Sequence, residues 1–519
     1  MNRKITLGGW NFYFLAKLLL FFRHEIGLHP LENLGFAAFL LIPVDSPRWR
    51  KARLAVSIPL AAALLYYDSW LPPFSRAISQ ASLIYSFSLP YLMELAGRFI
   101  NGEAIAALVI AYAAYRLVSM RIKIGVLVVG TLIFLLFSGK PQTLTPVAAV
   151  SATSPTGGNL RQILDGAVAS FFAREAGRSV TFASPGKGEV PFDVVFIHVC
   201  SLAWDDVKAV GLDSHPLWGR FDFLFTNFNS ASTYSGPAAI RVLRSTCGQQ
   251  QHADLYSPVP GKCYLMDSLK ASGFAPNFAM NHDGHFDDFL KTVQAQGEAM
   301  NMTPISDEGI RVDQHAFDDS PIYDDLGVLS RWLEGRKQND APRVALYYNT
   351  ISLHDGNHML GENAGKGSRD TYKLRLSRLL DQIDEFMRRI ETSGRKVVVV
   401  MVPEHGAAYR GDRMQIPGLR EIPTPAITLI PVGIKVAGGG REGGQARIDS
   451  PSSFLAMTTV ISKMLEKSPY DSKGFSASDY AGSLPETDYV AENQNMLMLR
   501  KDNRYYLRQD PDGWSEYTP

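Results

Sequence analysis

Cysteine is scarce in this sequence, because the 519 residues include only Cys200, Cys247 and Cys263. Three cysteines leave room for one disulfide and one thiol. Pairing Cys247 with Cys263, 16 positions apart, closes a loop that stabilises a chain by about 3 kcal/mol in an oxidising compartment. Cys200 is then a free thiol, and metal ligation is its first candidate role. Internal repeats are absent from the sequence as well.

An excess of basic charge is absent from most of the chain. Residues 1–140 hold 14 Lys and Arg against 6 Asp and Glu, whereas residues 141–519 hold 38 against 45. The resulting net charges of +8 and −7 are concealed by the overall value of +1. Because the basic excess is confined to the first part, nucleic-acid binding has no support. The two parts predict a change of environment near residue 140.

The apolar segments of the first part are mostly shorter than the ~20 residues that span a bilayer comfortably. They lie near 10–22, 31–44, 54–70, 105–120 and 122–137. Basic residues fall in alternate connections between these segments: Arg3, Lys4; Arg48, Arg50, Lys51, Arg53; Arg116, Arg121, Lys123. The positive-inside rule then predicts a transmembrane domain of about five helices over residues 1–140, with the rest of the chain outside the cytoplasm.

The first apolar segment is expected to be an uncleaved anchor, since no small-residue cleavage site follows it. The alternative is that this segment, with its Lys17, lies in the membrane interface, which would invert the topology. Residues 141–185 read as a linker with a possible amphipathic helix over 159–176.

Residues 186–519 alternate apolar runs with helical patterns. The runs 192–199 and 344–348 are typical of strands, and the pattern over 373–389 is typical of a helix. Strands that alternate with helices predict an α/β domain with a mostly parallel sheet flanked by helices. Residues 495–517 are expected to form a small closing hairpin.

The most informative stretch is 397–406, a run of valines that ends at Glu404 and His405. A continuous β-branched run suits a strand covered on both faces, and ligands of parallel sheets gather at the carboxyl ends of strands. Two other predicted strands end at unusual groups, Cys200 and the cluster from His354 to His358. Each has an ordinary alternative: a surface turn, a buried thiol, or a loop hydrogen bond. Together they favour a zinc site of thiolate, carboxylate and imidazole with a fourth position open.

Ser235 is the candidate for that fourth position. It stands in Tyr234-Ser235-Gly236-Pro237, where proline followed by good helix formers predicts a helix start. An ordinary serine N-cap is the alternative. In the functional interpretation, the free amide groups of the helix start favour a phosphate beside the hydroxyl, and zinc makes an alkoxide accessible near neutral pH.

These residues resemble the alkaline phosphatase superfamily, in its branch of membrane-anchored phosphoethanolamine and glycerophosphate transferases. More closely, the chain is similar to the phosphoethanolamine transferases of bacterial cellulose biosynthesis. The likeness runs through nearly the whole chain, including the predicted membrane part. The matching segments are Cys200-Ser201-Leu202 with Trp204, Asn227 to Ser230, Tyr234 to Arg241, Leu353 to His358, Pro403 to Gly406, Gly411 to Met414, and Pro451 to Leu455.

The resemblance implies an alkaline-phosphatase-like fold with one zinc ion held by Cys200, Glu404, His405 and the nucleophile Ser235. It implies that Tyr234, His354, His358 and Arg420 line the site, and it supports the Cys247–Cys263 disulfide. It further implies a phosphatidylethanolamine donor, the 6-hydroxyl of cellulose glucosyl units as acceptor, and subunits of a cellulose synthase complex as partners. The expected location is the bacterial inner membrane, with residues 186–519 in the periplasm.

Two departures from the wider superfamily stand out, since Cys200 replaces an acidic ligand and Glu404 an aspartate. A sulfatase is disfavoured because its signature of Pro and Arg after the nucleophile is absent at Cys200. Transfer to lipid A or another envelope glycan is an alternative, although Ser235 and three cysteines favour cellulose over the threonine and additional disulfides of lipid A enzymes. A non-catalytic scaffold of a polysaccharide-secretion complex is the alternative from another class.

Overall fold

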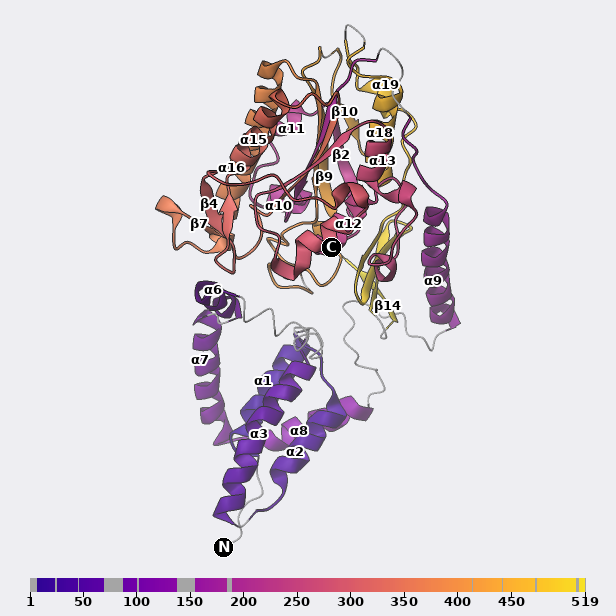
Figure 1. The fold of residues 1–519 in the computed structure, drawn as a ribbon. Helices are drawn as coiled ribbons and strands as arrows, with labels where there is room; N and C mark the ends of the chain where they lie inside the picture. The colour runs from indigo at the N-terminus through magenta and orange to yellow at the C-terminus, as the bar shows by residue number, and fades with distance from the viewer. Residues whose placement is uncertain are drawn as a thin grey trace. The chain divides into compact units, whose positions relative to one another are not determined.

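The computed structural model divides the chain into two compact units, Met1–Ala149 and Val150–Pro519 (Figure 1). The structure describes residues 7–23, 26–44, 46–69, 87–99, 102–137, 155–183, 189–412, 414–440, 442–471, 474–509 and 513–518. The first part of the predicted linker, 141–154, lies outside these residues, as do Arg3, Lys4 and Arg413.

Helices make up the regular secondary structure of the first unit in its described residues. Its helices are α1 (Trp10–Phe22), α2 (Pro30–Leu41), α3 (Pro47–Tyr67), α6 (Leu89–Phe99), α7 (Gly102–Ser119) and α8 (Ile124–Phe137). Two of them begin at a proline, which fits the first helical position because its missing N–H has no partner there anyway. Phe14, Phe36 and Val128 bring α1, α2 and α8 into one apolar core.

A buried polar cluster joins three helices of this unit. The Lys17 ammonium on α1 pairs with the carboxylate of Asp68 at the end of α3 and donates to Asn33 Oδ1 on α2 over 2.8 Å. Asn33 and the ring of His29 contact the same carboxylate at 2.9 and 2.6 Å. Lys17 is therefore inside the helix cluster, where its charge is compensated.

By length and composition, no single helix among the described residues could cross a membrane. One bent pair, Ala106–Ser119 with Ile124–Phe137, meets these criteria jointly, with an angle of 106° between its helices. The expected span near 54–70 corresponds to α3, which begins at Pro47 and so takes in the basic residues Arg48 to Arg53. Helix α6 was not among the expected segments.

The second unit is built on a seven-stranded sheet with strand order β10-β2-β9-β8-β1-β6-β3. Its strands are β1 (Asp193–Val199), β2 (Phe223–Asn229), β3 (Ala275–Met280), β6 (Val344–Thr350), β8 (Val397–Pro403), β9 (Leu429–Ala437) and β10 (Ala446–Ile448). Strand β9 is antiparallel to both neighbours, β2 and β8, and all other pairs are parallel. The predicted mostly parallel α/β sheet is confirmed.

Helices cover both faces of this sheet (Figure 1). One core contains α12 (Ser235–Leu243), α13 (Leu265–Ala271), α14 (Phe289–Gln294) and α18 (Phe454–Glu466); the other contains α10 (Trp204–Ala209), α11 (Leu217–Arg220), α15 (Asp325–Lys337) and α16 (Ser368–Ser393). Every residue of β8 is buried, and its side chains alternate between the two cores. Burial on both faces explains why this strand has no polar alternation.

Two small sheets and two further short helices, α17 (Pro425–Thr428) and α19 (Ser478–Ala481), complete the unit. One sheet joins β4 (Val312–His315), β5 (Pro321–Tyr323) and β7 (His358–Met359). The other joins β11 (Val490–Asn493), β12 (Met496–Lys501), β13 (Arg504–Gln509) and β14 (Gly513–Tyr517). The predicted hairpin over 495–517 is therefore wrong in extent, because four strands form this sheet. Helix α9 (Pro155–Ala176) packs on it through Leu164 and Phe171.

Candidate metal centre

The candidate site forms where two neighbouring parallel strands end. Strands β1 and β8 pair in register up to Val199 and Pro403, so the residues that follow, Cys200 and Glu404, emerge side by side. The Glu404 N–H donates to the Val199 carbonyl over 2.8 Å, and the Leu202 N–H donates to the His405 carbonyl over 2.6 Å. The sheet therefore fixes the backbone of both loops at the point where the chemistry begins.

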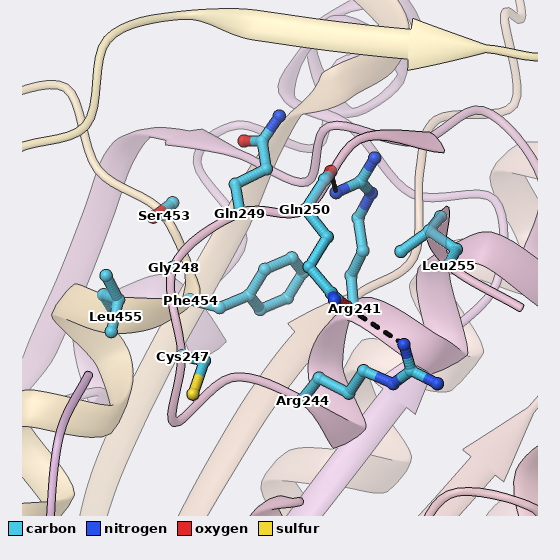
Figure 2. Close-up of a pocket in the computed structure, with 10 residues that line it drawn as sticks. All are labelled: Arg241, Arg244, Cys247, Gly248, Gln249, Gln250, Leu255, Ser453, Phe454 and Leu455. Atoms are coloured by element: carbon cyan, nitrogen blue, oxygen red, sulfur yellow. Dashed lines mark hydrogen bonds between the residues drawn. The ribbon is translucent and has the colours of Figure 1, made fainter. Parts of the chain in front are cut away.

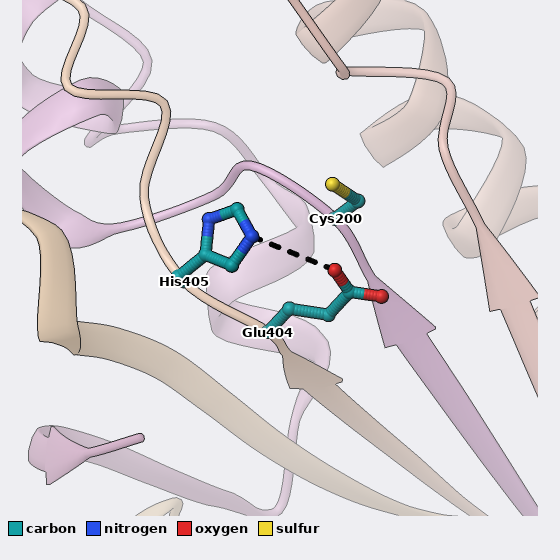
Figure 3. Close-up of side chains that lie close together, drawn as sticks. All are labelled: Cys200, Glu404 and His405. Atoms are coloured by element: carbon teal, nitrogen blue, oxygen red, sulfur yellow. Dashed lines mark ion pairs between the residues drawn. The ribbon is translucent and has the colours of Figure 1, made fainter. Parts of the chain in front are cut away.

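Cys200, Glu404 and His405 point toward one another at this edge (Figure 3). One donor atom from each lies within 4.8 Å of the others, and all three side chains are fully buried. Glu404 Oε2 and His405 Nε2, 3.6 Å apart, are buried without a hydrogen-bond partner among the described residues. Such atoms cost about 1–3 kcal/mol each when left unsatisfied. A thiolate, a carboxylate and an imidazole are the donor set of zinc sites, so the residues present fit a zinc ion.

Burial is the largest influence on the pKa values of the three donors. It raises the pKa of the Cys200 thiol to about 12, and the charge of Glu404 acts in the same direction. It raises the pKa of Glu404, although the polar groups of Ser235, Asn349 and Cys200 oppose this. It lowers the pKa of His405 well below its ordinary value, with help from the charge of Arg420. A cation bound to these donors displaces protons, so its affinity depends on pH.

A second layer of side chains holds the donors in place. Asn349, on β6, donates from Nδ2 to Glu404 Oε1 over 2.7 Å, and its Oδ1 lies 2.9 Å from Nε2 of His282. His405 Nδ1 lies 2.9 Å from the Gly406 carbonyl oxygen. An N–H at Nδ1 that donates to this carbonyl leaves Nε2 free to bind a metal. The donors are therefore oriented before any ion binds.

Asp206 ties together the two loops that carry the donors. Its carboxylate accepts the N–H of Ala203 at 3.0 Å, of Ala407 at 2.7 Å and of Tyr409 at 3.0 Å. Burial raises the pKa of Asp206 to about 7, while the three N–H groups act in the opposite direction. Asp206 thus joins the backbone that follows Cys200 to the backbone that follows His405.

Ser235 lies beside the three donors at the first position of α12. Its Oγ is 3.5 Å from Cys200 Sγ, and its side chain is partly exposed. Tyr234 before it has an extended backbone, and Pro237 follows within the first turn. The helix start leaves backbone N–H groups without intrahelical partners next to the hydroxyl. The structure therefore combines a hydroxyl, a candidate metal site and an anion-binding helix end.

Arg420 and Tyr234 lie close to this group. Arg420 Nη1 donates to Ser201 Oγ over 3.1 Å and lies 3.3 Å from His405 Nδ1. Its guanidinium sits 5.6 Å from the centre of the Tyr234 ring, whose hydroxyl donates to Glu421 over 2.6 Å. A cation held at this position can contact a phosphate without entering the metal site.

The two histidines of the predicted cluster lie in different settings. His354 Nδ1 is 2.6 Å from the Asp355 carbonyl oxygen. Burial, and then the charge of Arg420, lower the pKa of His354 to about 4. His358 belongs to β7, opposite His315 in the three-stranded sheet, and its Nε2 is buried without a partner among the described residues. Neither is among the clustered metal donors found in the described residues.

The disulfide of the structure joins Cys247 with Cys263, and Cys200 is the free, buried cysteine. The sequence interpretation did not identify Asn349, His282 or Asp206 as parts of the site. Asn349 had a detectable signal, because it lies near the end of a predicted strand. The contacts of Asp206 join segments about two hundred positions apart, and nothing in the sequence marks them.

Comparisons with known proteins match nearly the whole chain. A model of the cellulose biosynthesis protein BcsG C-terminal domain matches residues 149–514, and one of the BcsG N-terminal domain matches residues 10–137. The cellulose biosynthesis proteins BcsG of Salmonella typhimurium and Escherichia coli are each 39% identical to it, over 98% of this chain and 96% of theirs. A solved protein in the alkaline phosphatase superfamily from Vibrio parahaemolyticus aligns with a TM-score of 0.49 and 13% identity, over 68% of this chain and 87% of that one.

Proposed function

The chain belongs to the family of the cellulose biosynthesis protein BcsG, and on this basis we propose that it transfers phosphoethanolamine from phosphatidylethanolamine to the 6-hydroxyl of glucosyl units in nascent cellulose. The observation that supports this most directly is the position of Ser235 Oγ, 3.5 Å from Cys200, at a helix start and beside three buried metal donors. We also assign the second unit to the alkaline phosphatase superfamily.

One zinc ion held by Cys200, Glu404 and His405, with Ser235 as the fourth ligand, would lower the pKa of the Ser235 hydroxyl and offset charge on the transferred phosphoryl group. Asn349 and the Gly406 carbonyl orient Glu404 and His405 for that role.

In the first step Ser235 Oγ attacks the phosphorus of the donor. The Oγ–P bond forms, the bond from phosphorus to the diacylglycerol oxygen breaks, and the serine proton ends on that oxygen. The N–H groups at the start of α12 and the guanidinium of Arg420 stabilise the negative phosphoryl oxygens. The product is a phosphoethanolamine ester of Ser235.

In the second step the glucosyl 6-hydroxyl attacks the same phosphorus, the Oγ–P bond breaks, and the hydroxyl proton returns to Ser235. A neutral imidazole can carry this proton. His354 and His358 are the two candidates, and burial together with the charge of Arg420 lowers the pKa of His354 to about 4, so its imidazole is neutral at pH 7. With Nδ1–H donating to the Asp355 carbonyl, its Nε2 is the proton acceptor.

We propose that the first unit anchors the protein in the bacterial inner membrane by about five helices, and that the second unit works in the periplasm. The alternation of basic connections supports this arrangement, as does a disulfide in the second unit. An anchored enzyme suits a lipid donor and an acceptor that emerges from a membrane-bound synthase.

The covalent step is tested by intact-mass analysis of the full-length protein after incubation with phosphatidylethanolamine vesicles. We expect a phosphoethanolamine adduct that maps to the peptide of Ser235. The adduct should disappear in Ser235→Ala and persist in Ser478→Ala, which removes an exposed hydroxyl on α19. An adduct that persists in Ser235→Ala would reject Ser235 as the nucleophile, and its absence from the wild-type protein would favour a non-catalytic scaffold.

The acceptor is tested on the exported polymer by solid-state NMR. Cells with the wild-type protein should export cellulose that carries a phosphoethanolamine signal, and cells with Ser235→Ala should not. If the wild-type protein loads Ser235 but the cellulose carries no such signal, another envelope glycan is the acceptor.

A further inference from the structure

The disulfide closes a loop that follows the nucleophile helix directly. Cys247 and Cys263 bound this loop, and a hydrogen bond of 2.9 Å from Thr246 Oγ1 to the Lys262 carbonyl joins its ends a second time. A cross-linked loop loses much of its conformational freedom. This segment is therefore held firmly at its base.

Arg241 of α12 and Arg244, the residue that follows the helix, both donate hydrogen bonds to this loop (Figure 2). Arg241 Nη1 donates to the Gln250 carbonyl over 2.8 Å, and Arg244 Nη1 donates to Gln250 Oε1 over 3.0 Å. Both side chains are buried. The cavity beside these arginines measures about 20 Å³, which is room for about one water molecule. It is therefore too small for a ligand, and the two arginines serve to anchor the loop.

This anchored loop presents one aromatic ring to solvent. Leu255 is buried, whereas Tyr256 next to it is 64% exposed, more than any other large apolar side chain that the structure describes between 155 and 518. The Tyr256 hydroxyl lies 3.7 Å from the position that a Cβ on Gly236 would occupy. Gly236 follows the nucleophile, so the ring stands at the rim of the candidate site.

The polar surroundings of Tyr256 suit a neutral, hydroxyl-rich ligand. Partial burial, and then the charge of Asp287, raise the pKa of the Tyr256 hydroxyl, so it stays protonated and can donate. Asp287 is an exposed residue whose carboxylate can accept from a ligand hydroxyl, while partial burial raises the pKa of that carboxyl; its backbone is left-handed with φ of 51°. A flat ring, a donor and an acceptor are available together.

We propose that Tyr256 is the platform on which a glucosyl unit of the acceptor stacks, so that its primary hydroxyl reaches the phosphorus carried by Ser235. This inference rests on the proposed function. The apolar face of a β-linked glucosyl ring is broad and flat, which matches an exposed aromatic face at the rim. The donor's ammonium is the competing ligand, but a solvent-exposed ring attracts a cation by only about 0.5–1 kcal/mol.

The test separates the two half-reactions in the full-length protein. Loading of Ser235 from phosphatidylethanolamine vesicles is followed by intact mass, and transfer from the loaded protein is followed with cellopentaose. Tyr256→Ala and Tyr256→Leu should load at the wild-type rate but transfer more slowly at low cellopentaose, by about threefold to tenfold, the size of one aromatic contact. The transfer rate should recover at high cellopentaose, and Tyr256→Phe should retain most of it.

Transfer by Tyr256→Ala at the wild-type rate and with the wild-type dependence on cellopentaose would overturn the inference. So would equal losses of loading and transfer, which indicate a general disturbance, or loss of loading alone, which indicates headgroup binding. Failure of the wild-type protein to load has a different meaning, because it overturns the proposed function and this inference with it.

Discussion

The two ends of strand β1 are equally buried, but their polar groups differ in hydrogen bonding. At the amino end, the Asp193 carboxylate accepts two hydrogen bonds from Arg336, at 3.1 and 3.0 Å, and a third from the Val344 N–H at 2.8 Å. Arg336 also donates to the carbonyls of Asn339 and Ala341. This buried ion pair is complete within the protein.

At the carboxyl end, the polar atoms are brought together without being satisfied. Glu404 Oε2 and His405 Nε2 have no hydrogen-bond partner among the described residues, although both side chains are fully buried. The second layer orients these groups and leaves their inward-facing atoms open. The amino end of the strand is therefore satisfied by protein groups alone, whereas the carboxyl end leaves donor atoms open to an outside group, as expected for the carboxyl ends of parallel strands.

Arg336→Met removes the ion pair at the amino end of β1, which we call the closed end, and has the largest expected effect on stability. It leaves the Asp193 carboxylate buried without its main partner, so the free energy of unfolding should fall by about 3–5 kcal/mol. Urea unfolding measures the change. The double variant with Asp193→Asn should recover part of the loss, and zinc affinity of the folded protein should not change. A loss below about 1 kcal/mol would indicate that water reaches this pair.

Glu404→Gln alters the carboxyl end of β1 and its neighbour β8, which we call the open end. It should change zinc affinity strongly and stability little. Loss of a residue that only hydrogen-bonds to a metal ligand lowers metal affinity by roughly 10–100-fold. Zinc affinity should fall further in Glu404→Gln, because a ligand itself is replaced. With chelator present, the free energy of unfolding should not decrease, since the substitution takes a carboxylate out of a buried site. Competition with a chromophoric chelator gives the affinity. A variant that binds zinc normally but unfolds easily would make Glu404 a structural residue.

Asn349→Ala changes only the second layer of side chains, because Asn349 is not one of the three metal donors. The hydrogen bond of 2.7 Å to Glu404 is lost while the three donors remain, so zinc affinity should fall by roughly 10–100-fold. Asn339→Ala, at the closed end, is the matched control and should leave the affinity unchanged. Equal effects of the two substitutions would contradict a local role for Asn349.

Acidification should affect the open end through His354. Its folded pKa of about 4 lies below the ordinary value near 6.5, so between these values the unfolded chain binds a proton that the folded chain does not. The stability that depends on neutral His354 is present above pH 6.5 and is lost as the pH falls toward 4, by at most about 1.4 kcal/mol per unit. Urea unfolding with chelator present measures this slope, which His354→Asn should reduce. An unchanged slope in His354→Asn would assign it to other groups.

Local patterns predicted the parts of the molecule that depend on one segment. The valine run 397–403, the strand before Cys200 and the helix start at Ser235 each have a local cause, namely β-branched burial or a proline in the first turn. Helix α6 was missed because Glu94 and Arg98 interrupt its apolar pattern.

Features that join distant segments were not predictable in the same way. The antiparallel insertion of β9 between β2 and β8 depends on how the chain returns to the sheet. The contacts of Asn349 with Glu404 and of Asp206 with two loops depend on tertiary packing. The short strand β11, Val490–Asn493, gave too little pattern, so the final sheet was predicted as a hairpin.

We infer that the open end of the sheet, at Cys200, Glu404 and His405, is a zinc site with one sulfur ligand. X-ray absorption at the zinc edge, on the full-length protein loaded with one equivalent of zinc, tests it most directly. We expect one sulfur at about 2.3 Å together with nitrogen and oxygen ligands at about 2.0–2.2 Å, and loss of the sulfur shell in Cys200→Ser. A zinc spectrum without sulfur in the wild-type protein, or one that Cys200→Ser leaves unchanged, would show that Cys200 is not a zinc ligand.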